Sequence, residues 1–519
     1  MTKSFQKILF LCGVFVAFTS CKSTKNNQAI TAKQPNIILF LVDDMGWQDT
    51  SVPFWTEKTP LNSRYHTPNM ERLAKEGMKF TQAYATPICT PTRVSLMSGM
   101  NAARHRVTNW TFKRDTLMVA PPAGLKMPEW NLNGAQSSDT IPRSTYITSL
   151  PEILKNNGYQ TIIVGKAHFG AFKTPSADPT NLGFDINIGG HAAGQPGSYY
   201  GTDNFRDLNR KTTDYDVPGL EKYHGKDIFL TEALTQEAIS AMDDAVADKK
   251  PFYLYLSQYA LHTPIQGDPR FEQKYKDAGL DPTEANYASL IEGMDKSLGD
   301  ILDHLDQKNL SKNTIILFMS DNGGLSAVER GGVKHTHNKP LSSGKGSVHE
   351  GGIREPMIVK WPGITTANST TDDFVIIEDY FPTLLEMAGI TKYKTVQTVD
   401  GKSFTPILKG KKQDNNTRAL FWHYPNNWGP TGPGIGASST IRKGDWKLIY
   451  YHLNRSFELF NITNDIGETT NLANQDPNKV KALAQELSAY LRSVNAQMPT
   501  DTNTNTLVPW PDSDTVLRK

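Results

Sequence analysis

The amino-acid sequence predicts an α/β fold: a large mixed, mostly parallel sheet flanked by helices, followed by a smaller C-terminal α+β domain. Two observations predict the sheet. Short apolar runs alternate with helical segments, and a polar cluster follows each of the clearest runs. A third observation predicts the second domain, because beyond about residue 400 the runs resemble antiparallel strands and a terminal helix follows them. We place the two domains at residues 35–410 and 411–519.

The composition is that of a globular protein with balanced charge. Of 519 residues, 38% are hydrophobic and 21% are charged, which is enough apolar material for a sizeable core. Lys and Arg total 55 and Asp and Glu total 53. This balance argues against a nucleic-acid partner held by bulk charge. Three cysteines are too few for a disulfide scaffold.

The N-terminus has the pattern of an export signal. Lys3 and Lys7 precede the apolar stretch Ile8–Phe18, which is too short to span a bilayer. The stretch leads to Cys21 in a setting that resembles a bacterial lipoprotein cleavage box. We expect residues 1–20 to be removed, Cys21 to be lipidated and residues 21–34 to form a flexible tether. The protein would then be exported and anchored by lipid to the cell envelope, at the outer membrane; a plain secretory signal is the alternative.

Short apolar runs predict buried parallel strands, and the segments between them predict helices. The expected strands are Asn36–Val42, Thr161–Val164, Phe252–Leu256 and Thr314–Met319. The expected helices include Thr67–Met78, Ile147–Asn156 and Leu230–Ala247.

Polar side chains follow all four predicted strands. In order along the chain they are Asp43 and Asp44, then Lys166 and His168, then His262, and finally Asp321 and Asn322. Ligand sites of open α/β sheets lie beyond the carboxyl ends of the strands. The sequence therefore predicts that these side chains converge on one site.

The last hundred or so residues predict an antiparallel sheet and one helix. The expected strands are Thr440–Arg442, Trp446–Tyr451 and Phe457–Asn461. Asp476 and Pro477 fit the cap and first turn of a helix. The apolar stripe of that helix is Val480, Leu483, Leu487, Leu491 and Val494. From Met498 the chain is polar, and we expect it to wrap around the domain or to hang free.

The segment Cys89-Thr90-Pro91-Thr92-Arg93 carries the most specific signal. Pro91 fits the first turn of a helix, which places Cys89 at the helix N-terminus, where anions are favoured. Arg93 lies one turn further on and can reach back. Together with Gly99, these residues resemble the Cys-x-Pro-x-Arg signature of the formylglycine-dependent sulfatase family, within the alkaline phosphatase-like superfamily.

The resemblance extends over roughly residues 35–519. Asp43-Asp44 and Ser320–Gly323 look like the two metal motifs of the family, and Gly165–Gly170 looks like its Lys-x-His element. Lys345, followed by Glu350–Arg354, looks like its lysine segment. The sequence departs from the family pattern at Met100, Ala167 and Glu355.

The resemblance implies that a separate formylglycine-generating or sulfatase-maturating enzyme oxidises Cys89 to formylglycine (3-oxoalanine). One hydroxyl of the hydrated aldehyde would attack sulfur and expel the alcohol, and the second would release sulfate and restore the aldehyde. Arg93 would hold the modified Cys89, while Lys166 and Lys345 would neutralise the sulfate. We choose His262 as the proton donor and His168 as the base.

The predicted metal ligands are oxygen atoms. Asp43, Asp44, Asp321 and Asn322 suit calcium or magnesium better than zinc. We expect one Ca²⁺ there, bound also by the modified Cys89. Adjacent acids such as Asp43 and Asp44 can instead be a helix cap or a solvated turn.

The predicted function is hydrolysis of sulfate esters on carbohydrates of the algal polysaccharide or glycosaminoglycan type. That substrate class rests on analogy. Candidate substrate-binding residues are His335, His337, His423 and Arg442, although the first two can also lie in a solvated loop. One alternative is a phosphate or phosphonate monoester hydrolase of the same superfamily. The other is a non-catalytic glycan-binding lipoprotein.

Overall fold

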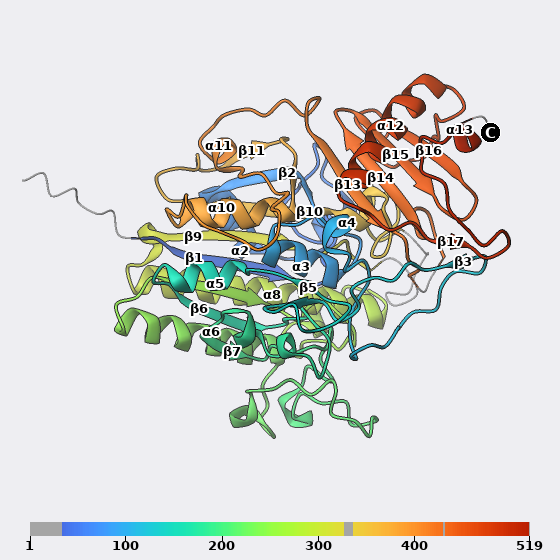
Figure 1. Cartoon of the computed structure of the whole chain (residues 1–519). Helices are drawn as coiled ribbons and strands as arrows, with labels where there is room; N and C mark the ends of the chain where they lie inside the picture. Colours follow the sequence, from blue (N-terminus) through green and yellow to red (C-terminus); the bar gives the residue numbers. More distant parts are fainter. Residues whose placement is uncertain (1–33, 326–335, 429–430, 518–519) are drawn as a thin grey trace, which may run out of the picture. The chain divides into compact units, whose positions relative to one another are not determined.

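The structure is a computed structural model that describes residues 34–325, 336–428 and 431–517 (Figure 1). Residues from Gln34 onward form one compact unit. No helix within the described ranges is long and apolar enough to cross a membrane. The predicted signal, the tether and the lipidation of Cys21 concern residues outside the described ones.

A nine-stranded sheet forms the centre of this unit. Its strand order is β11-β2-β10-β9-β1-β8-β6-β7, and β12 also pairs with β2. The strands are β1 (Asn36–Val42), β2 (Met78–Tyr84), β6 (Gln160–Gly165), β7 (Ile186–Ile188), β8 (Phe252–Ser257), β9 (Thr314–Ser320), β10 (Arg354–Lys360), β11 (Ser369–Thr371) and β12 (Val375–Ile376).

The sheet is mixed but mostly parallel, as predicted. β9, β1, β8, β6 and β7 run parallel to one another, whereas β10 runs antiparallel to both β9 and β2. The four predicted strands are confirmed as β1, β6, β8 and β9, within one residue at each end. β2 and β10 were not predicted, because polar residues interrupt their apolar runs.

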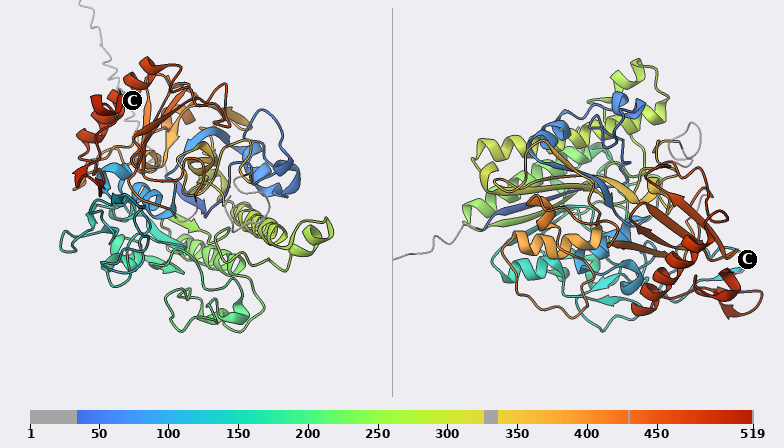
Figure 2. Two further views of the ribbon diagram at one scale, coloured as in Figure 1. Left: turned by 90° about the vertical axis from the view of Figure 1, so that its right-hand side faces the viewer. Right: turned by 90° about the horizontal axis from the view of Figure 1, so that it is seen from above.

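Helices cover both faces of the sheet. α2, α6 and α8 pack on one face, and α3, α5 and α10 pack on the other. The right-hand view of Figure 2 shows α10 in orange and α5 in teal on the opposite side of the sheet from α8. The predicted helix Leu230–Ala247 is α6 without change, while the other two are shorter than expected because Thr67 and Ser149 occupy their N-cap positions.

The helices have the following bounds: α1 (Pro60–Arg64), α2 (Pro68–Glu76), α3 (Cys89–Ser98), α4 (Ala102–His105), α5 (Leu150–Asn156), α6 (Leu230–Ala247), α7 (Glu272–Asp277), α8 (Pro282–Gln307), α9 (Glu350–Ile353), α10 (Tyr380–Met387), α11 (Thr405–Leu408), α12 (Pro477–Ser493) and α13 (Asp514–Leu517).

A second, antiparallel sheet lies beside the first (Figure 1). Its order is β13-β14-β15-β16, with β13 at Ala419–Tyr424, β14 at Ser438–Lys443, β15 at Trp446–Tyr451 and β16 at Ser456–Asn461. The apolar stripe of α12 packs on this sheet, and the Asp476 side chain caps the helix as predicted. The antiparallel sheet with its helix is confirmed, while the domain boundary at residue 411 stays a prediction.

The tail beyond Met498 does not hang free. β17 (Thr500–Asp501) pairs with β18 (Thr506–Leu507) and with β3 (Leu125–Lys126) from the first half of the chain. A further short pair joins β4 (Ala135–Gln136) to β5 (Thr145–Tyr146). The tail thus fastens the C-terminal sheet to the larger part of the unit.

Candidate active site

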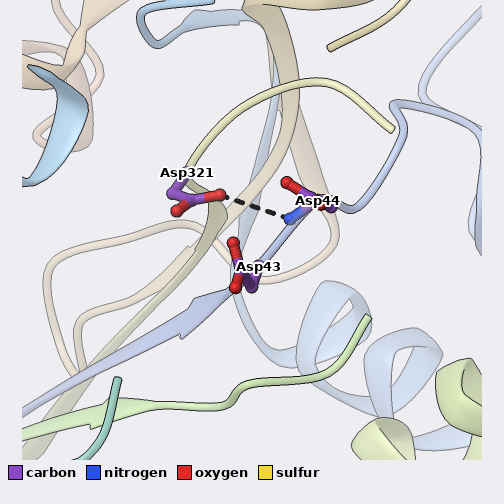
Figure 3. Close-up of side chains that lie close together, drawn as sticks. All are labelled: Asp43, Asp44 and Asp321. Atoms are coloured by element: carbon purple, nitrogen blue, oxygen red, sulfur yellow. Dashed lines mark hydrogen bonds between the residues drawn. The ribbon is translucent and has the colours of Figure 1, made fainter. Parts of the chain in front are cut away.

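The carboxyl ends of neighbouring parallel strands bring the predicted acids together. Val42 at the end of β1 lies opposite Ser320 at the end of β9, so the residues that follow each strand meet. Figure 3 shows Asp43, Asp44 and Asp321 pointing toward one another. One carboxylate oxygen from each lies within 4.8 Å of the others, and all three side chains are buried.

The cluster has oxygen atoms without a hydrogen-bond partner. Asp43 Oδ1 and Asn322 Oδ1 are buried and accept no hydrogen bond. By contrast, the backbone amide of Asp44 donates to Asp321 Oδ1 at 3.2 Å. A buried acceptor without a partner lowers the stability of the folded protein unless a bound ligand or ion supplies the missing interaction. Carboxylate and amide oxygen atoms that surround one position are suitable ligands for a calcium or magnesium ion.

Three cations alternate with the three acids. Lys166 Nζ lies 2.7 Å from Asp43 Oδ2, and Lys345 Nζ lies 2.7 Å from Asp44 Oδ1. Arg93 completes the set with Nη2 2.8 Å from Asp321 Oδ2. When all six side chains are ionised, their formal charges cancel. A divalent cation would make the site net positive and suited to an anionic substrate.

Arg93 is fixed by the same strand ends. Its Nη1 atom donates to the Lys166 carbonyl oxygen at 2.9 Å and to Ser257 Oγ at 2.7 Å. α3 is buried along its whole length, so the side chain extends from a rigid helix. A helix that starts at Cys89 thus places both Cys89 and Arg93 at the cluster.

Burial and neighbouring charges shift the pKa values of Asp43 and Asp44 in opposite directions. Burial raises the pKa of Asp43 well above its usual range, and nearby Asp321 and Asp44 raise it further against the opposing effect of Lys166. For Asp44, burial is outweighed by Lys345, followed by His262 and Lys166, which hold its pKa below the usual range. A bound cation would favour the charged form of Asp43.

Cys89 faces a histidine that can accept a proton. Cys89 Sγ lies 3.4 Å from His168 Nδ1. His168 Nε2 donates to the Thr111 carbonyl oxygen at 2.8 Å, which leaves Nδ1 with its lone pair toward Cys89. Burial, together with Lys166, lowers the pKa of His168 well below its usual value, and burial also raises the pKa of the Cys89 thiol. The imidazole is therefore a neutral base.

His262 approaches the cluster from the other side. Its Nε2 atom lies 3.8 Å from Asp44 Oδ2, while Nδ1 lies 3.0 Å from the Thr263 carbonyl oxygen. Burial and then Lys345 lower its pKa to about 3. The structure thus brings His262 to the site as a neutral imidazole.

The segment that carries Lys345 packs directly onto the end of β9. A Cβ atom at Gly323 would lie 1.9 Å from the Gly351 carbonyl oxygen, so only glycine fits there. The amide of Gly323 donates to the Gly352 carbonyl oxygen at 3.1 Å. This close approach positions Lys345 beside Asp44.

The structure places the predicted substrate-binding residues in different surroundings. His335 lies outside the described residues, and His337 lines a surface cleft with Leu61 and Leu280. His423 is buried, with Nδ1 2.9 Å from Ser439 Oγ and Nε2 donating to the Gln497 carbonyl oxygen at 3.0 Å.

Arg442 is also engaged elsewhere. Its Nη2 donates to Gln82 Oε1 at 3.3 Å, and its guanidinium lies 4.9 Å from the centre of the Phe374 ring. Polar atoms of His423 and Arg442 are thus bonded to other residues of the protein. These contacts give no support to a substrate-binding role for either side chain.

Several residues that shape the site were not predicted. Thr111 fixes the tautomer of His168 through its backbone, and Ser257 and Tyr255 hold Arg93. The contact of Thr111 with His168 could not be predicted from the sequence, because any residue type offers a backbone carbonyl. The polar end of β8 was a usable signal, since Ser257 directly follows the predicted strand.

Comparison with known proteins agrees with this geometry. The family model "Sulfatase" matches residues 35–390, and a second model, "N-sulphoglucosamine sulphohydrolase, C-terminal", matches residues 344–497. A sulfatase of Formosa agariphila is 32% identical over 99% of both chains. N-acetylgalactosamine-6-sulfatase of Mus musculus is 33% identical over 76% of this chain and 69% of its own.

A solved structure covers almost the whole described unit. The crystal structure of Ps i-CgsB in complex with k-i-k-neocarrahexaose is 26% identical, with a TM-score of 0.69 over 93% of this chain and 96% of that one. The phosphonate monoester hydrolase of Agrobacterium radiobacter shares the fold at 18% identity and a TM-score of 0.56.

Proposed function

Because this chain belongs to the sulfatase family, whose members hydrolyse sulfate esters, we propose that its substrates are sulfated carbohydrates. Relatives named for N-acetylgalactosamine 6-sulfate and a similar structure holding a carrageenan-type hexasaccharide support this class. The proposed products are inorganic sulfate and the desulfated sugar. Algal polysaccharide or glycosaminoglycan fragments are the proposed source of the sugar.

We infer that Cys89 supplies the nucleophile after conversion to formylglycine by a separate maturating enzyme. The observation that carries this inference is the position of Cys89: it starts a buried helix, faces the lone pair of His168 and is close enough to Lys166, Lys345 and Arg93 to interact with their charges. A hydrated formylglycine would place one hydroxyl toward the bound sulfur.

The proposed cofactor is one Ca²⁺. Asp43, Asp44, Asp321 and Asn322 would hold it together with the modified Cys89, and the unpartnered Asp43 Oδ1 and Asn322 Oδ1 support the fit. Bound there, the ion would neutralise charge on a sulfate oxygen and lower the pKa of the attacking hydroxyl.

His168 and the lysines have separate roles in the proposed reaction. Since Nδ1 of His168 faces position 89, it takes the hydroxyl proton of the hydrated side chain. Lys166 and Lys345 each bind a sulfate oxygen and are held in place by Asp43 and Asp44. Arg93 keeps the hydrated side chain oriented.

His262 delivers the proton that the leaving sugar alcohol needs. In the free protein its pKa of about 3 leaves it uncharged at neutral pH. A sulfate ester bound at Lys345 would bring negative charge toward His262, which favours the protonated form of the imidazole.

Peptide mass spectrometry combined with a substrate panel tests the proposal. The peptide containing Cys89 from native protein is expected to be about 18 Da lighter than the cysteine form, as formylglycine requires. Matured protein should release sulfate from sulfated mono- and oligosaccharides and act far more slowly on matched phosphate monoesters. Preference for the phosphate esters would instead identify a phosphate or phosphonate hydrolase, and binding without turnover would identify a glycan-binding protein.

We also propose that the enzyme is exported and anchored through a lipid on Cys21. The support is the apolar Ile8–Phe18 stretch before that cysteine. Metabolic labelling with a radioactive fatty acid should label the native protein and leave a Cys21→Ala variant unlabelled. Equal labelling of both would contradict the anchor.

A further inference from the structure

An indole lies against the lysine that faces the acidic cluster. Lys345 Nζ is 5.4 Å from the centre of the Trp428 ring and 2.7 Å from Asp44 Oδ1. The indole edge packs on the backbone of Gly346: a Cβ atom there would lie 2.1 Å from Trp428 Cδ1. Because Gly346 also has φ at +87°, glycine is needed for both the backbone turn and this contact.

The Trp428 segment is held in place from two sides. Asn426 Nδ2 donates to the Thr108 carbonyl oxygen at 2.8 Å, and Tyr424 Oη donates to the Asn427 carbonyl oxygen at 3.1 Å. On the other side, the amide of Gly346 donates to the Pro87 carbonyl oxygen at 2.8 Å, two residues before Cys89. The Gly346 backbone that the indole contacts is thus tied to the segment that leads to Cys89.

Trp428 is more exposed to solvent than Lys345 and Cys89, so a ligand can reach the indole. Lys345 and Cys89 are 5% and 4% exposed, whereas Trp428 is only half-buried. The indole therefore lies between the buried charged cluster and solvent. Tryptophan offers a rigid apolar face, and pyranose rings present C–H groups that pack on such faces.

We propose that Trp428 is the platform for the sugar ring that carries the sulfate ester, with the ring on the indole and the sulfate on Lys345. A sulfate ester joins the two groups through a single oxygen, so a platform for the sulfated ring must lie within one ring's reach of the sulfate-binding cation. Trp428 meets this condition. The inference rests on the proposed function and names the residue that recognises the hexopyranose.

The test compares Trp428→Ala and Trp428→Phe with the unchanged enzyme. KM and kcat are measured on the best sulfated monosaccharide of the panel, together with the inhibition constant of inorganic sulfate. Trp361→Ala is the matched control, because Lys409 Nζ lies 5.7 Å from the Trp361 ring in a similar cation–aromatic contact and no contact of Trp361 reaches the cluster among the described residues.

We expect Trp428→Ala to raise KM about tenfold with little change in kcat, and Trp428→Phe to recover most of the loss. The inhibition constant of sulfate should stay unchanged, as should all constants of Trp361→Ala. An equal loss of sulfate binding would overturn the proposal, since Trp428 would then act by positioning Lys345. An unchanged KM would overturn it as well.

Binding is also measured in a Cys89→Ala background, by calorimetry with the same sulfated monosaccharides. This measurement separates the two proposals. If the matured enzyme turns over no sulfate ester but Trp428→Ala still weakens sugar binding about tenfold, the platform stands and the proposed function fails. If no sulfated monosaccharide binds, the platform itself is wrong.

Discussion

Two buried charge clusters in the described part of the chain differ in how closely cations approach their carboxylate oxygens: Asp43 Oδ1 lies 3.9 Å from Arg93 Nη2, whereas Glu468 Oε1 lies 2.9 Å from Lys447 Nζ. At the strand ends, Asp43 Oδ1 and Asn322 Oδ1 have no hydrogen-bond partner. Beneath the C-terminal sheet, Lys447 on β15 lies 3.0 Å from Glu350 Oε1 and 2.9 Å from Glu468 Oε1, and all three side chains are fully buried. Both clusters join segments that are far apart in the sequence.

The second cluster is closed. Glu350 Oε2 accepts a hydrogen bond from Tyr84 Oη at 3.0 Å, and Glu468 Oε2 accepts one from the amide of Glu350 at 2.7 Å. Glu468 Oε1 accepts no hydrogen bond but lies 2.9 Å from Lys447 Nζ, so every carboxylate oxygen of this network has a donor group within 3.0 Å. Coulombic attraction by Lys447 and Arg354 outweighs burial and holds the pKa of Glu350 at about 2.

The comparison shows how a structural ion network can be told from a ligand site. A closed network satisfies its own charges and stabilises the contact between two sheets. An open one leaves buried acceptors without a partner, and here it also leaves one carboxyl, that of Asp43, with a raised pKa that a bound cation would lower. The two clusters should therefore respond in opposite ways to substitution.

The largest expected effect is the loss of turnover in Cys89→Ala. Removing the nucleophile of a covalent mechanism should lower kcat by at least about 10³-fold. The melting temperature should change little, because the hydrogen bond that Cys89 Sγ makes among the described residues is a long one, 3.4 Å to His168 Nδ1. Sulfate release and thermal melting are measured on the same preparation. Residual turnover within tenfold of the unchanged enzyme would contradict the role given to Cys89.

Asp43→Asn should separate activity from stability in the open cluster. The amide cannot replace a charged metal ligand, so we expect turnover to fall about 10²-fold or more. In chelator-treated protein the variant should melt no lower than the unchanged enzyme, because burial and the neighbouring acids already disfavour the Asp43 charge. Added Ca²⁺ should raise the melting temperature of the unchanged enzyme alone. A similar shift in both proteins would place the ion elsewhere.

Lys447→Met should show the opposite pattern in the closed network. It leaves Glu350 and Glu468 buried without their shared cation, and we expect the free energy of unfolding to fall by about 3–5 kcal/mol. Denaturant unfolding followed by tryptophan fluorescence measures the loss. The matched control is Lys447→Met combined with Glu350→Gln, which removes one of the unpaired charges and should recover part of the stability. A larger loss in the double variant would show that the pair is not coupled.

The polar residues that end consecutive parallel strands could be predicted from the sequence. Asp43 directly follows an apolar run, and Lys166 and Asp321 follow theirs after one intervening residue. The parallel register of β1 and β9 then brings Asp43 and Asp321 together. Cys89 and Arg93 were predictable for a similar reason, since one helix presents both.

Contacts between distant segments could not be predicted in the same way. Lys447 pairs with Glu350 across 97 residues, and the backbone of Thr111 holds His168 across 57 residues. Neither contact has a local pattern. The burial of His423 could not be predicted for a related reason, because a strand places alternate side chains on opposite faces and the register decides which face is buried.

The smallest expected effect concerns His423, a buried neutral histidine in the C-terminal sheet. Burial lowers the pKa of His423 to about 4, below its usual value of 6.5. Between these values the unfolded chain binds a proton that the folded protein does not, so stability is full above about pH 6.5 and falls as the pH drops toward 4. We expect His423 to contribute about 2 kcal/mol of destabilisation between pH 7 and pH 5. Urea unfolding of the unchanged enzyme and of His423→Gln at both pH values measures the difference. Turnover at pH 7 should be the same in both proteins. The reason is that His423 contacts Ser439 and Gln497, whereas the proposed base, His168, contacts Cys89. If the variant lost as much stability on acidification as the unchanged enzyme, the burial of His423 would not be the source of the pH dependence.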